Sequence, residues 1–506
     1  MRTQFDVIVV GAGNGGLAAA ATTARAGLST LLLEKHNVPG GSASTFRRGR
    51  FEFEPSLHEL CSVGTKENPQ KIYNIFKELG CEIDWRYEYN TFRAICDGED
   101  GYDVKLRAGF DNFCDDMEKA VPGSRESVKA FFDLVKKNDE ALAYVYEKKG
   151  NPNPLVMLFK HADFLKSASH STEEVEIALG MPEKARNIMN TYWGYLGVPT
   201  DDLNAMHYLS MVGSYVDDGA AMPYKRSHEL SLALEKSITD AGGEVWYNAQ
   251  VSKFLYKEDG SCCGVQLQDG TELYAKEIIS NIIPNNVYGM SDPKFVPEKE
   301  LKLANARTLG MTFVTIYVGL DCSKEELGIE DYTIFKMPFP NPREQFNRRE
   351  EGTYYVFNCL NEVIPDASPK GTCMLFFTVP LMPGDLPENL TQYNYKKWKN
   401  ELAEVYIKDC EKSMGFDIMS HIEEISVATP VSFARYLGTP NGEVYGYQNE
   451  NWDSVINRSQ AQFTDFTVPH LHYCGGHSVM GDGFSSAYIT GHDTGIRVVN
   501  SIKGGK

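Results

Sequence analysis

A glycine-rich turn near the start of the chain has the residue spacing of a phosphate-binding site. Gly11, Gly13 and Gly16 follow an apolar run over residues 5–10 in the pattern GxGxxG. The first glycine of this pattern permits a tight turn, the second lets the backbone approach a pyrophosphate, and the third lets the next helix pack against the sheet. Free N–H groups at the start of that helix attract phosphate oxygens. The turn therefore indicates dinucleotide binding.

The elements expected on both sides of this turn strengthen that interpretation. The apolar run predicts a strand, small residues over 17–26 predict a helix, and residues 30–33 predict a second strand that ends in Glu34. Glu34 stands roughly 20 residues after Gly11, where a carboxylate binds ribose hydroxyls. A glycine-rich loop in an ordinary sheet is the alternative, and it does not require a strand, a helix and an acid at these spacings.

A second glycine turn follows at Pro39, Gly40, Gly41 and Ser42. Two adjacent glycines remove side-chain obstruction, so that the backbone can lie against a ligand. A plain hairpin turn is the alternative interpretation. Residues 50–54 then alternate between apolar and polar side chains, which is typical of a short strand.

The composition excludes several classes of protein. The 506 residues indicate two or more domains, and no apolar run of about 18 residues predicts a membrane helix. The net charge of −19 argues against nucleic-acid binding and against general attraction to anionic membranes. The 11 cysteines are scattered, without the spacing of a zinc site. Because no export signal is recognised, we expect a cytoplasmic protein with reduced thiols, no structural disulfide and no bound metal.

Changes in periodicity divide the chain into five segments. Helical periodicity dominates residues 68–215, strand-like runs return over 216–303, and a mixed pattern of strands and helix covers 304–424. Residues 425–506 again have a sequence pattern like that of residues 1–67. We therefore expect an α/β fold in which residues 1–67, 216–303 and 425–506 assemble a Rossmann-type domain. Residues 68–215 would form a helical substrate or lid region, and 304–424 a mixed α+β substrate domain.

One apolar helical surface in the second segment has more than one interpretation. Within a helix expected over 154–165, residues 156–159 and 164–165 are apolar and carry few charges nearby. An internal core face is the structural interpretation. The functional alternatives are a lid over an apolar cavity and a patch that touches a membrane surface.

Five blocks of the sequence resemble the family of FAD-dependent phytoene desaturases, carotenoid isomerases and retinol saturases, within the flavin amine oxidase fold. They occur in order at 11–16, 34–46, 242–280, 428–447 and 473–491. The match spans nearly the full length, with looser similarity in the helical and mixed segments. The last block is the most specific and contains Tyr473-Cys474-Gly475-Gly476, then Gly481-Asp482-Gly483, then Ala487 and Gly491.

The resemblance implies FAD as the cofactor and gives each block a place along it. The first glycine turn would hold the pyrophosphate, Glu34 the adenosine ribose, and Val251 the adenine through its backbone. Gly476 would approach the ribityl chain. The helix that begins at Gly483 would direct its N-terminus at the isoalloxazine ring, where its dipole stabilises negative charge on reduced flavin. The implied cofactor-binding residues are Gly11, Gly13, Asn14, Gly15, Gly16, Glu34, Lys35, Gly40, Gly41, Ser42, Val251, Gly476, His477, Asp482, Gly483 and Phe484.

Two positions depart from the family pattern. His477 stands where the family usually has an acid after the C-terminal glycines. Residues 224–228 replace a glycine pair that often follows the proline at Pro223 with bulkier and charged side chains. Both departures bear on the identity of the substrate more than on the cofactor.

Four side chains are the candidate catalytic residues. His58 and Glu59 follow the strand expected at 50–54, where family members line the front of the flavin, and either can act as an acid or a base. A supporting hydrogen bond is the alternative role for both. Arg435 would either grip a substrate carboxylate or form a surface salt bridge. Tyr445 would either stack near the flavin or fill the core.

Three functions fit these observations. The first is a flavoenzyme that desaturates, saturates or isomerises the carbon–carbon double bonds of an apolar, polyunsaturated substrate. Ser42, where desaturases commonly carry arginine, favours the isomerase and saturase branch. The second is an amine oxidase-like flavoenzyme, and the third is a lipid-binding relative without flavin, against which the intact glycines argue. The expected partners are an apolar or amphiphilic small molecule, an unidentified electron donor or acceptor, and a peripheral membrane surface, but no nucleic acid.

Overall fold

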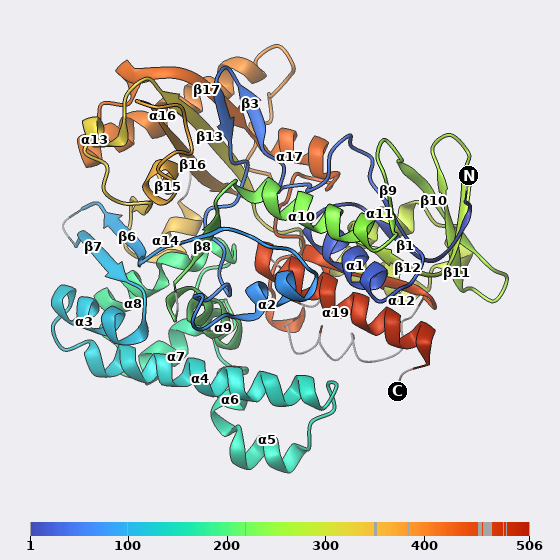
Figure 1. Ribbon diagram of the computed structural model, residues 1–506. Coiled ribbons are helices and arrows are strands. Elements are labelled where there is room, and N and C mark those ends of the chain that lie inside the picture. The colour runs from blue at the N-terminus through green and yellow to red at the C-terminus, as the bar shows by residue number, and fades with distance from the viewer. Residues whose placement is uncertain are drawn as a thin grey trace.

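The computed structural model describes residues 2–98, 100–217, 219–348, 352–382, 384–453, 458, 468–478, 480–481 and 483–504. Figure 1 shows three regions within these residues. A sheet with α1 and α19 lies on the right, a second sheet with α16 lies at the upper left, and a group of helices around α4 lies at the lower left. The confirmed fold class is α/β, and two seven-stranded sheets position the site.

The first sheet is built around a parallel centre. Its strand order is β10 (Val251–Tyr256), β11 (Cys262–Leu267), β12 (Glu272–Ser280), β1 (Gln4–Val10), β2 (Thr30–Leu33) and β9 (Glu244–Trp246), with β18 (Leu471–Tyr473) also paired to β12. Strand β1 pairs in parallel with both β2 and β12. The end of β1 is apolar and buried because helices cover both faces of a parallel sheet.

Helices α1 (Asn14–Arg25) and α19 (Phe484–Lys503) pack closely against each other and against this sheet. The close approach depends on glycines. A Cβ on Gly16 would stand 1.9 Å from the carbonyl oxygen of Gly11, and a Cβ on Gly491 would stand 2.1 Å from that of Gly15. Helix α10 (Ser227–Asp240) also packs on α1. These contacts fix the start of α1 against the end of β1.

The second sheet is formed mostly by the mixed segment. Its order is β17 (Ile422–Ala428), β13 (Thr312–Leu320), β16 (Cys373–Leu381), β15 (Tyr355–Cys359), β14 (Thr333–Met337), β6 (Asn90–Cys96) and β7 (Tyr102–Arg107). Strand β13 is buried on both faces. Val314, Ile316 and Val318 pack in one core with residues of α16 (Tyr395–Met414), whereas Phe313 and Tyr317 belong to the cores on the other face.

The helical segment contains α3 (Phe110–Ala120), α4 (Arg125–Glu147), α5 (Pro154–Lys160), α6 (Ala162–Ser167), α7 (Thr172–Ala178), α8 (Glu183–Met189) and α9 (Ala205–Val216). The single helix expected over 154–165 is two helices, because the backbone leaves helical geometry at His161. Residues 68–215 also contribute β6 and β7 to the second sheet. Buried and exposed side chains alternate along β7, as in a strand with one exposed face. A strand was not predicted from this alternation in the sequence.

Shorter elements connect these regions. They are β3 (Phe46–Arg48), β4 (Phe51–Phe53), α2 (Lys71–Glu78), β5 (Trp85–Tyr87), η1 (Asn190–Tyr195), β8 (Ala221–Pro223), α11 (Pro284–Gly289), η2 (Pro293–Phe295), α12 (Glu298–Ala306), α13 (Lys324–Leu327), α14 (Pro342–Asn347), α15 (Leu360–Val363), η3 (Met419–His421), α17 (Pro430–Leu437), η4 (Asn451–Asp453) and η5 (Gly475–His477). None of the 11 cysteines forms a disulfide. Among the described helices, none is both long and apolar enough to cross a membrane.

Candidate functional site

A large cavity lies between the first sheet, the second sheet and the helical region. Its volume is about 1310 Å³, whereas small-molecule sites usually occupy roughly 300–1,000 Å³. The end lined by Gly11, Gly13, Gly15 and Glu34 is called the glycine-turn end here. The other end is lined by His58, Glu59, Phe313 and Tyr317, and it is called the carboxyl end after the side chain of Glu59. The cavity therefore has room for a dinucleotide and a second molecule.

The glycine-turn end presents the start of α1 to the cavity. The helix follows Gly13, which has extended backbone geometry, and none of the described side chains caps it. Its first turn carries no acidic residue. Gly13, Asn14 and Gly15 all line the cavity, so their N–H groups and the positive end of the helix dipole are available to an anion. These features fit a pyrophosphate.

Glu34 lies beside this turn at the end of β2. Its Oε2 accepts a hydrogen bond of 2.7 Å from the N–H of Ala12, and its Oε1 accepts one of 2.8 Å from the N–H of His36. The carboxylate is buried but still lines the cavity, together with Lys35. Each carboxylate oxygen can accept a further hydrogen bond, which fits a pair of ribose hydroxyls.

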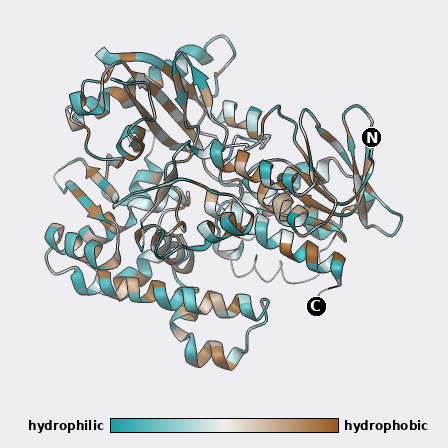
Figure 2. Cartoon of the chain, in the orientation of Figure 1, coloured by the Kyte–Doolittle hydropathy of each residue, from teal (hydrophilic) through white to brown (hydrophobic). Residues whose placement is uncertain are grey.

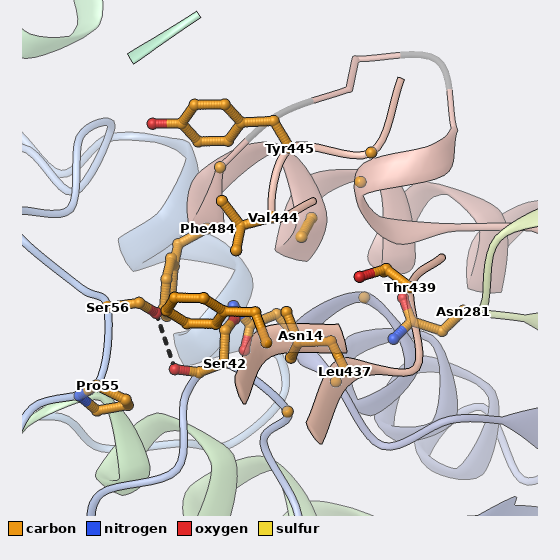
Figure 3. A pocket seen from close by; sticks show the side chains of 18 of the residues that line it. Asn14, Ser42, Pro55, Ser56, Asn281, Leu437, Thr439, Val444, Tyr445 and Phe484 are labelled. Atoms are coloured by element: carbon orange, nitrogen blue, oxygen red, sulfur yellow. Dashed lines mark hydrogen bonds between the residues drawn. The ribbon is translucent and has the colours of Figure 1, made fainter. Parts of the chain in front are cut away.

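A second helix N-terminus points into the middle of the cavity. Helix α19 starts after Gly483, and no described side chain caps it and no acid stands in its first turn. Phe484, Ser485 and Ser486 line the cavity there. Figure 3 shows Phe484 in the same part of the cavity as Ser42. A group that gains negative charge would be stabilised at this position.

Most of the predicted site residues line this one cavity. They are Gly11, Gly13, Asn14, Gly15, Glu34, Lys35, Gly41, Ser42, His58, Glu59, Val251, Tyr445, Gly476, His477, Gly483 and Phe484. Four others do not. Gly16 packs against Gly11, and Gly40 donates its N–H to the carbonyl oxygen of Ala12 at 2.7 Å, so both shape the turn from behind. Arg435 is exposed on α17, outside the lining, and Asp482 lies outside the described residues.

The loop that carries His58 and Glu59 is held by a buried carboxylate. Glu54 accepts hydrogen bonds of 2.8 Å from both the N–H and the hydroxyl of Ser227, and one of 3.0 Å from the N–H of Leu57. Ser56 donates its hydroxyl to the carbonyl oxygen of Ser42 at 3.0 Å, the bond drawn in Figure 3. The loop is thereby tied both to the start of α10 and to the second glycine turn.

His58 is a neutral imidazole at the carboxyl end. Its Nε2 lies 2.6 Å from the hydroxyl of Thr378 on β16. Burial lowers the pKa of His58 to about 4, because the charged ring would lose its hydration. An uncharged histidine here can orient a ligand by hydrogen bonding, and it is a poor proton donor near neutral pH.

Glu59 is the buried carboxyl group of this end. Its Oε1 accepts hydrogen bonds from the hydroxyl of Tyr195 at 2.9 Å and from that of Tyr192 at 3.3 Å. Burial raises the pKa of Glu59 despite these two donors. A carboxyl group that titrates closer to neutrality is suited to exchange a proton with a ligand.

Several cavity residues were missed by sequence reasoning. Asn281 follows β12, and its side chain lies over the glycine turn: a Cβ on Gly13 would stand 2.7 Å from its Nδ2. Its position after a parallel strand next to β1 was the available signal. Phe313 and Tyr317 come from β13, whose unbroken apolar run gave no indication of which face lines a cavity. Tyr215 reaches the same end from α9.

Tyr445 and Tyr447, at the end of the fourth block, have different roles. Tyr445 lines the cavity and makes an edge-to-face contact with Phe313, with ring centroids 5.2 Å apart. Tyr447 is a core residue, 1% exposed, and donates its hydroxyl to Asn285. His477 is beside Tyr447, and burial lowers the pKa of His477 to about 4. The position that usually carries an acid therefore holds a neutral side chain.

Comparison with known proteins agrees with this geometry. Residues 9–79 match a family model described as an NAD(P)-binding Rossmann-like domain. The chain is 26% identical over 480 residues to an all-trans-retinol 13,14-reductase from Danio rerio, covering 88% of this chain and 77% of the relative. It is 24% identical over 468 residues to a chloroplastic prolycopene isomerase from Daucus carota, covering 88% and 72%. A putrescine oxidase structure matches with a TM-score of 0.66 and 15% identity, covering 98% of this chain and 99% of that one.

These comparisons confirm the resemblance inferred from the five blocks. The chain is a homologue of retinol reductases and prolycopene isomerases, and its fold is that of the flavin amine oxidases. The Rossmann-like match covers the glycine turn and Glu34. An oxidoreductase that uses FAD is the class of enzyme that these relatives and this fold imply.

Proposed function

We propose that this protein is an FAD-dependent enzyme that saturates, desaturates or isomerises carbon–carbon double bonds of an apolar, polyunsaturated substrate such as a retinoid or a carotenoid. One observation carries the proposal: a single cavity joins a glycine-turn end with uncapped helix termini to an aromatic end with a buried carboxyl group. The two groups of curated relatives are named for the reduction of retinol and the isomerisation of prolycopene. Both names describe chemistry on a conjugated polyene.

The cofactor domain in this proposal comprises residues 1–67, 216–303 and 425–506. Its support is the first sheet, which takes β1 and β2 from the first segment, β9 to β12 from the second, and β18 from the third. Residues 68–215 and 304–424 would form the substrate region. The second sheet, which joins β6 and β7 to strands of the mixed segment, supports grouping these two segments together.

Bound FAD would supply hydride transfer to or from the substrate. The chain's own residues would hold and enclose the reactants. The glycine turn and α1 would bind the pyrophosphate, Glu34 the ribose, and the start of α19 would stabilise negative charge on the flavin. Gly41 and Ser42 would lie along the ring system.

At the carboxyl end, apolar side chains would exclude water from the substrate. Phe313, Tyr317 and Tyr445 supply an aromatic surface suited to a polyene. Glu59 would exchange a proton with the substrate, while neutral His58 would orient it through a hydrogen bond. Because both ends belong to one cavity, a substrate bound at the carboxyl end would be able to reach a cofactor held at the glycine-turn end.

The decisive experiment is mass spectrometry of products after anaerobic incubation of reduced, FAD-loaded protein with a panel of retinoids and carotenoids. A product of unchanged mass and altered retention time would make the enzyme an isomerase. A gain of two hydrogens would make it a saturase, and a loss of two hydrogens with oxidised protein would make it a desaturase. No change with any polyene would overturn the proposal, and turnover of amines with formation of peroxide would replace it with the amine oxidase alternative.

Substitution of Glu59 tests the proposed proton exchange. The Glu59→Gln variant keeps the size and the hydrogen-bond acceptor but cannot release a proton. We expect turnover of the active polyene to fall by about 10²–10⁴-fold, the usual contribution of a general acid or base. Flavin absorbance per protein should stay unchanged, because Glu59 is not among the residues proposed to hold FAD. An active Glu59→Gln enzyme would remove Glu59 from the mechanism.

We also propose a peripheral contact with a membrane through the face formed by Leu155, Leu158, Phe159 and Leu165. These side chains are 64%, 56%, 80% and 39% exposed, although they belong to an apolar pair of helices. Apolar colouring gathers on α5 in Figure 2. Exposed clusters of this kind on a monomer often mark a lipid or protein surface.

Neighbouring groups support lipid as the partner. Lys160 and Lys166 are exposed on the same two helices, although the whole chain carries a net charge of −19. Met157 and Phe164 pack this helix pair on α4, whose Leu142 and Tyr146 line the cavity. An apolar substrate leaving a membrane at this face would therefore have a short path to the cavity.

Vesicle flotation tests this contact. Protein should float with vesicles that contain anionic phospholipid, and the double variant Leu158→Ser, Phe159→Ser should reduce the bound fraction at least about tenfold, given that each buried apolar side chain contributes roughly 1.5–3 kcal/mol. Leu232→Ser, at a 46% exposed leucine on α10, is the matched control. Equal binding by all three proteins would contradict the assignment of the face.

A further inference from the structure

A second buried carboxyl group stands behind Glu59. Glu88 lies between β5 and β6, is 5% exposed, and donates its backbone N–H to the carbonyl oxygen of Ala220 at 2.9 Å. Its side chain faces that of Glu59, and the charge of each carboxyl group acts on the other. Oε2 of Glu59 and both side-chain oxygens of Glu88 are buried without a hydrogen-bond partner in the described part of the chain. Because two unpartnered buried carboxylates repel each other, one of the two groups keeps a proton.

In the described part of the chain, no positive charge near the pair favours ionisation of both groups. The titratable side chains that face it are His58, the thiol of Cys61, and the hydroxyls of Tyr192 and Tyr195 on η1, Tyr215 on α9, and Tyr332 before β14. Among the described residues, no lysine or arginine contributes to the electrostatics of either carboxyl group. His58 is neutral because burial lowers its pKa to about 4.

The two carboxyl groups differ in their hydrogen bonds. Glu59 accepts from two tyrosine hydroxyls at Oε1, which stabilise its charged form. Glu88 has no such donor, and burial together with repulsion from Glu59 raises the pKa of Glu88 well above its ordinary value. When one proton remains on the pair, it therefore resides on Glu88. Oε2 of Glu59 accepts no hydrogen bond from a tyrosine, so it is the oxygen that can accept a hydrogen bond from Glu88.

We propose that Glu88 is a positioning residue that stays protonated and donates a hydrogen bond to Glu59, so that Glu59 is the member of the pair that exchanges its proton with the cavity. The inference rests on the proposed function of Glu59 and adds what controls it. When Glu59 releases its proton, the O–H bond breaks, its electron pair stays on Glu59, and the acceptor in the cavity forms the new bond to hydrogen. The resulting carboxylate is held by three O–H donors: Glu88, Tyr192 and Tyr195.

This arrangement predicts different results for two substitutions at one position. Glu88→Gln keeps a neutral donor to Glu59. Glu88→Leu removes the donor and leaves a carboxylate that is harder to form, so the pKa of Glu59 rises further. The alkaline limb of the pH–rate profile should then move upward by about one pH unit, a tenfold rise in proton affinity, in the leucine variant. In the glutamine variant it should stay within a few tenths of a unit of the wild type.

An activity-free measurement accompanies the kinetics. Infrared difference spectra of the purified holoprotein, titrated with pH, detect protonated carboxyl groups. Glu88→Gln should remove a carboxyl band that persists above neutral pH, and Glu59→Gln should remove one that titrates at lower pH. Glu176→Gln is the matched control, because Glu176 is a fully buried carboxyl group outside the cavity lining whose pKa burial raises to about 8. It should remove its own band and leave the other two in place.

The outcomes separate this inference from the proposed function. Loss of no band on Glu88→Gln, or an equal shift of the alkaline limb in the glutamine and leucine variants, would overturn the role of Glu88. The expected infrared bands without turnover of any polyene would leave the carboxyl pair in place and overturn the proposed function instead. Because Glu88→Leu can disturb folding, the glutamine variant and the spectra test the proposal independently of it.

Discussion

The two ends of the cavity are built from different parts of the chain. The glycine-turn end consists mainly of backbone atoms within one strand–turn–helix unit, from β1 to Glu34. The carboxyl end consists of side chains from a loop, from β13, from η1 and from α9, which are far apart in sequence. The glycine-turn end forms because glycines leave the backbone uncovered. The carboxyl end forms because side chains from distant parts of the chain meet there. Only the first leaves a local pattern in the sequence.

The ends also differ in how they treat charge. The glycine-turn end offers unpaired N–H groups at a helix start to an anion. The carboxyl end disfavours charge on its titratable groups, because burial lowers the pKa of His58 and raises that of Glu59. An anionic cofactor and an apolar substrate therefore find opposite environments within one cavity. Changes at each end should have separable effects.

The largest effect is expected at the glycine-turn end. In Gly16→Ala the new Cβ would stand 1.9 Å from the carbonyl oxygen of Gly11, so the turn must move. Strain of this kind costs roughly 1–3 kcal/mol or more, and flavin retention should fall by about tenfold or more. The flavin-to-protein absorbance ratio after desalting measures it.

The control for this variant is Gly243→Ala, which lies after α10 and outside the cavity lining. A Cβ there would stand 2.7 Å from Cγ2 of Ile238, so it introduces a steric change away from the turn, and flavin retention should equal that of the wild type. Circular dichroism shows whether Gly16→Ala still folds. A folded Gly16→Ala protein that keeps all of its flavin would show that the turn does not specify the cofactor end.

The sequence was sufficient to predict the first end and its fold. The apolar strand, the three glycines and Glu34 lie within about 25 residues, and each has a local physical reason. The three-segment assembly of the cofactor domain stays a prediction; the first sheet draws its strands from all three segments. Pairing of β6 with β14 was not predicted, because a parallel contact between segments this far apart leaves no local periodicity.

The second end was predicted only in part. His58 and Glu59 were named because they follow a recognisable strand, but their partners Thr378, Tyr192 and Glu88 belong to other elements. A sequence pattern states which residues are apolar or titratable, and long-range packing decides which of them meet. The glutamate pair is invisible in the sequence for that reason.

A smaller effect is expected at the carboxyl end when His58 is replaced. His58→Gln can keep the hydrogen bond to Thr378 but cannot titrate. In the wild type, His58 binds a proton below about pH 6.5 in the unfolded state but only below about pH 4 in the folded state. The free energy of unfolding therefore falls as the pH is lowered through this window, by about 1.4 kcal/mol per pH unit from this group.

Denaturant unfolding at several pH values measures this contribution. The stability of the wild type relative to His58→Gln should decrease by that slope between pH 6.5 and 4 and stay constant above pH 7. A difference that does not change with pH would mean that water reaches the ring and that the carboxyl end is not dry. The two ends of the cavity would then not differ in their access to water.

The smallest effect is expected at Arg435, where the sequence pattern suggested a substrate contact. Helix α17 turns Phe433 into the core and leaves Arg435 exposed, with its guanidinium 5.8 Å from the ring centre of Tyr436. Arg435→Ala should change the free energy of unfolding by less than about 0.5 kcal/mol, as is usual for surface positions. Flavin retention and the KM for a polyene should not change. A rise in KM of more than about tenfold, equivalent to 1.4 kcal/mol, would place a substrate group outside the cavity and would extend the carboxyl end to the surface of α17.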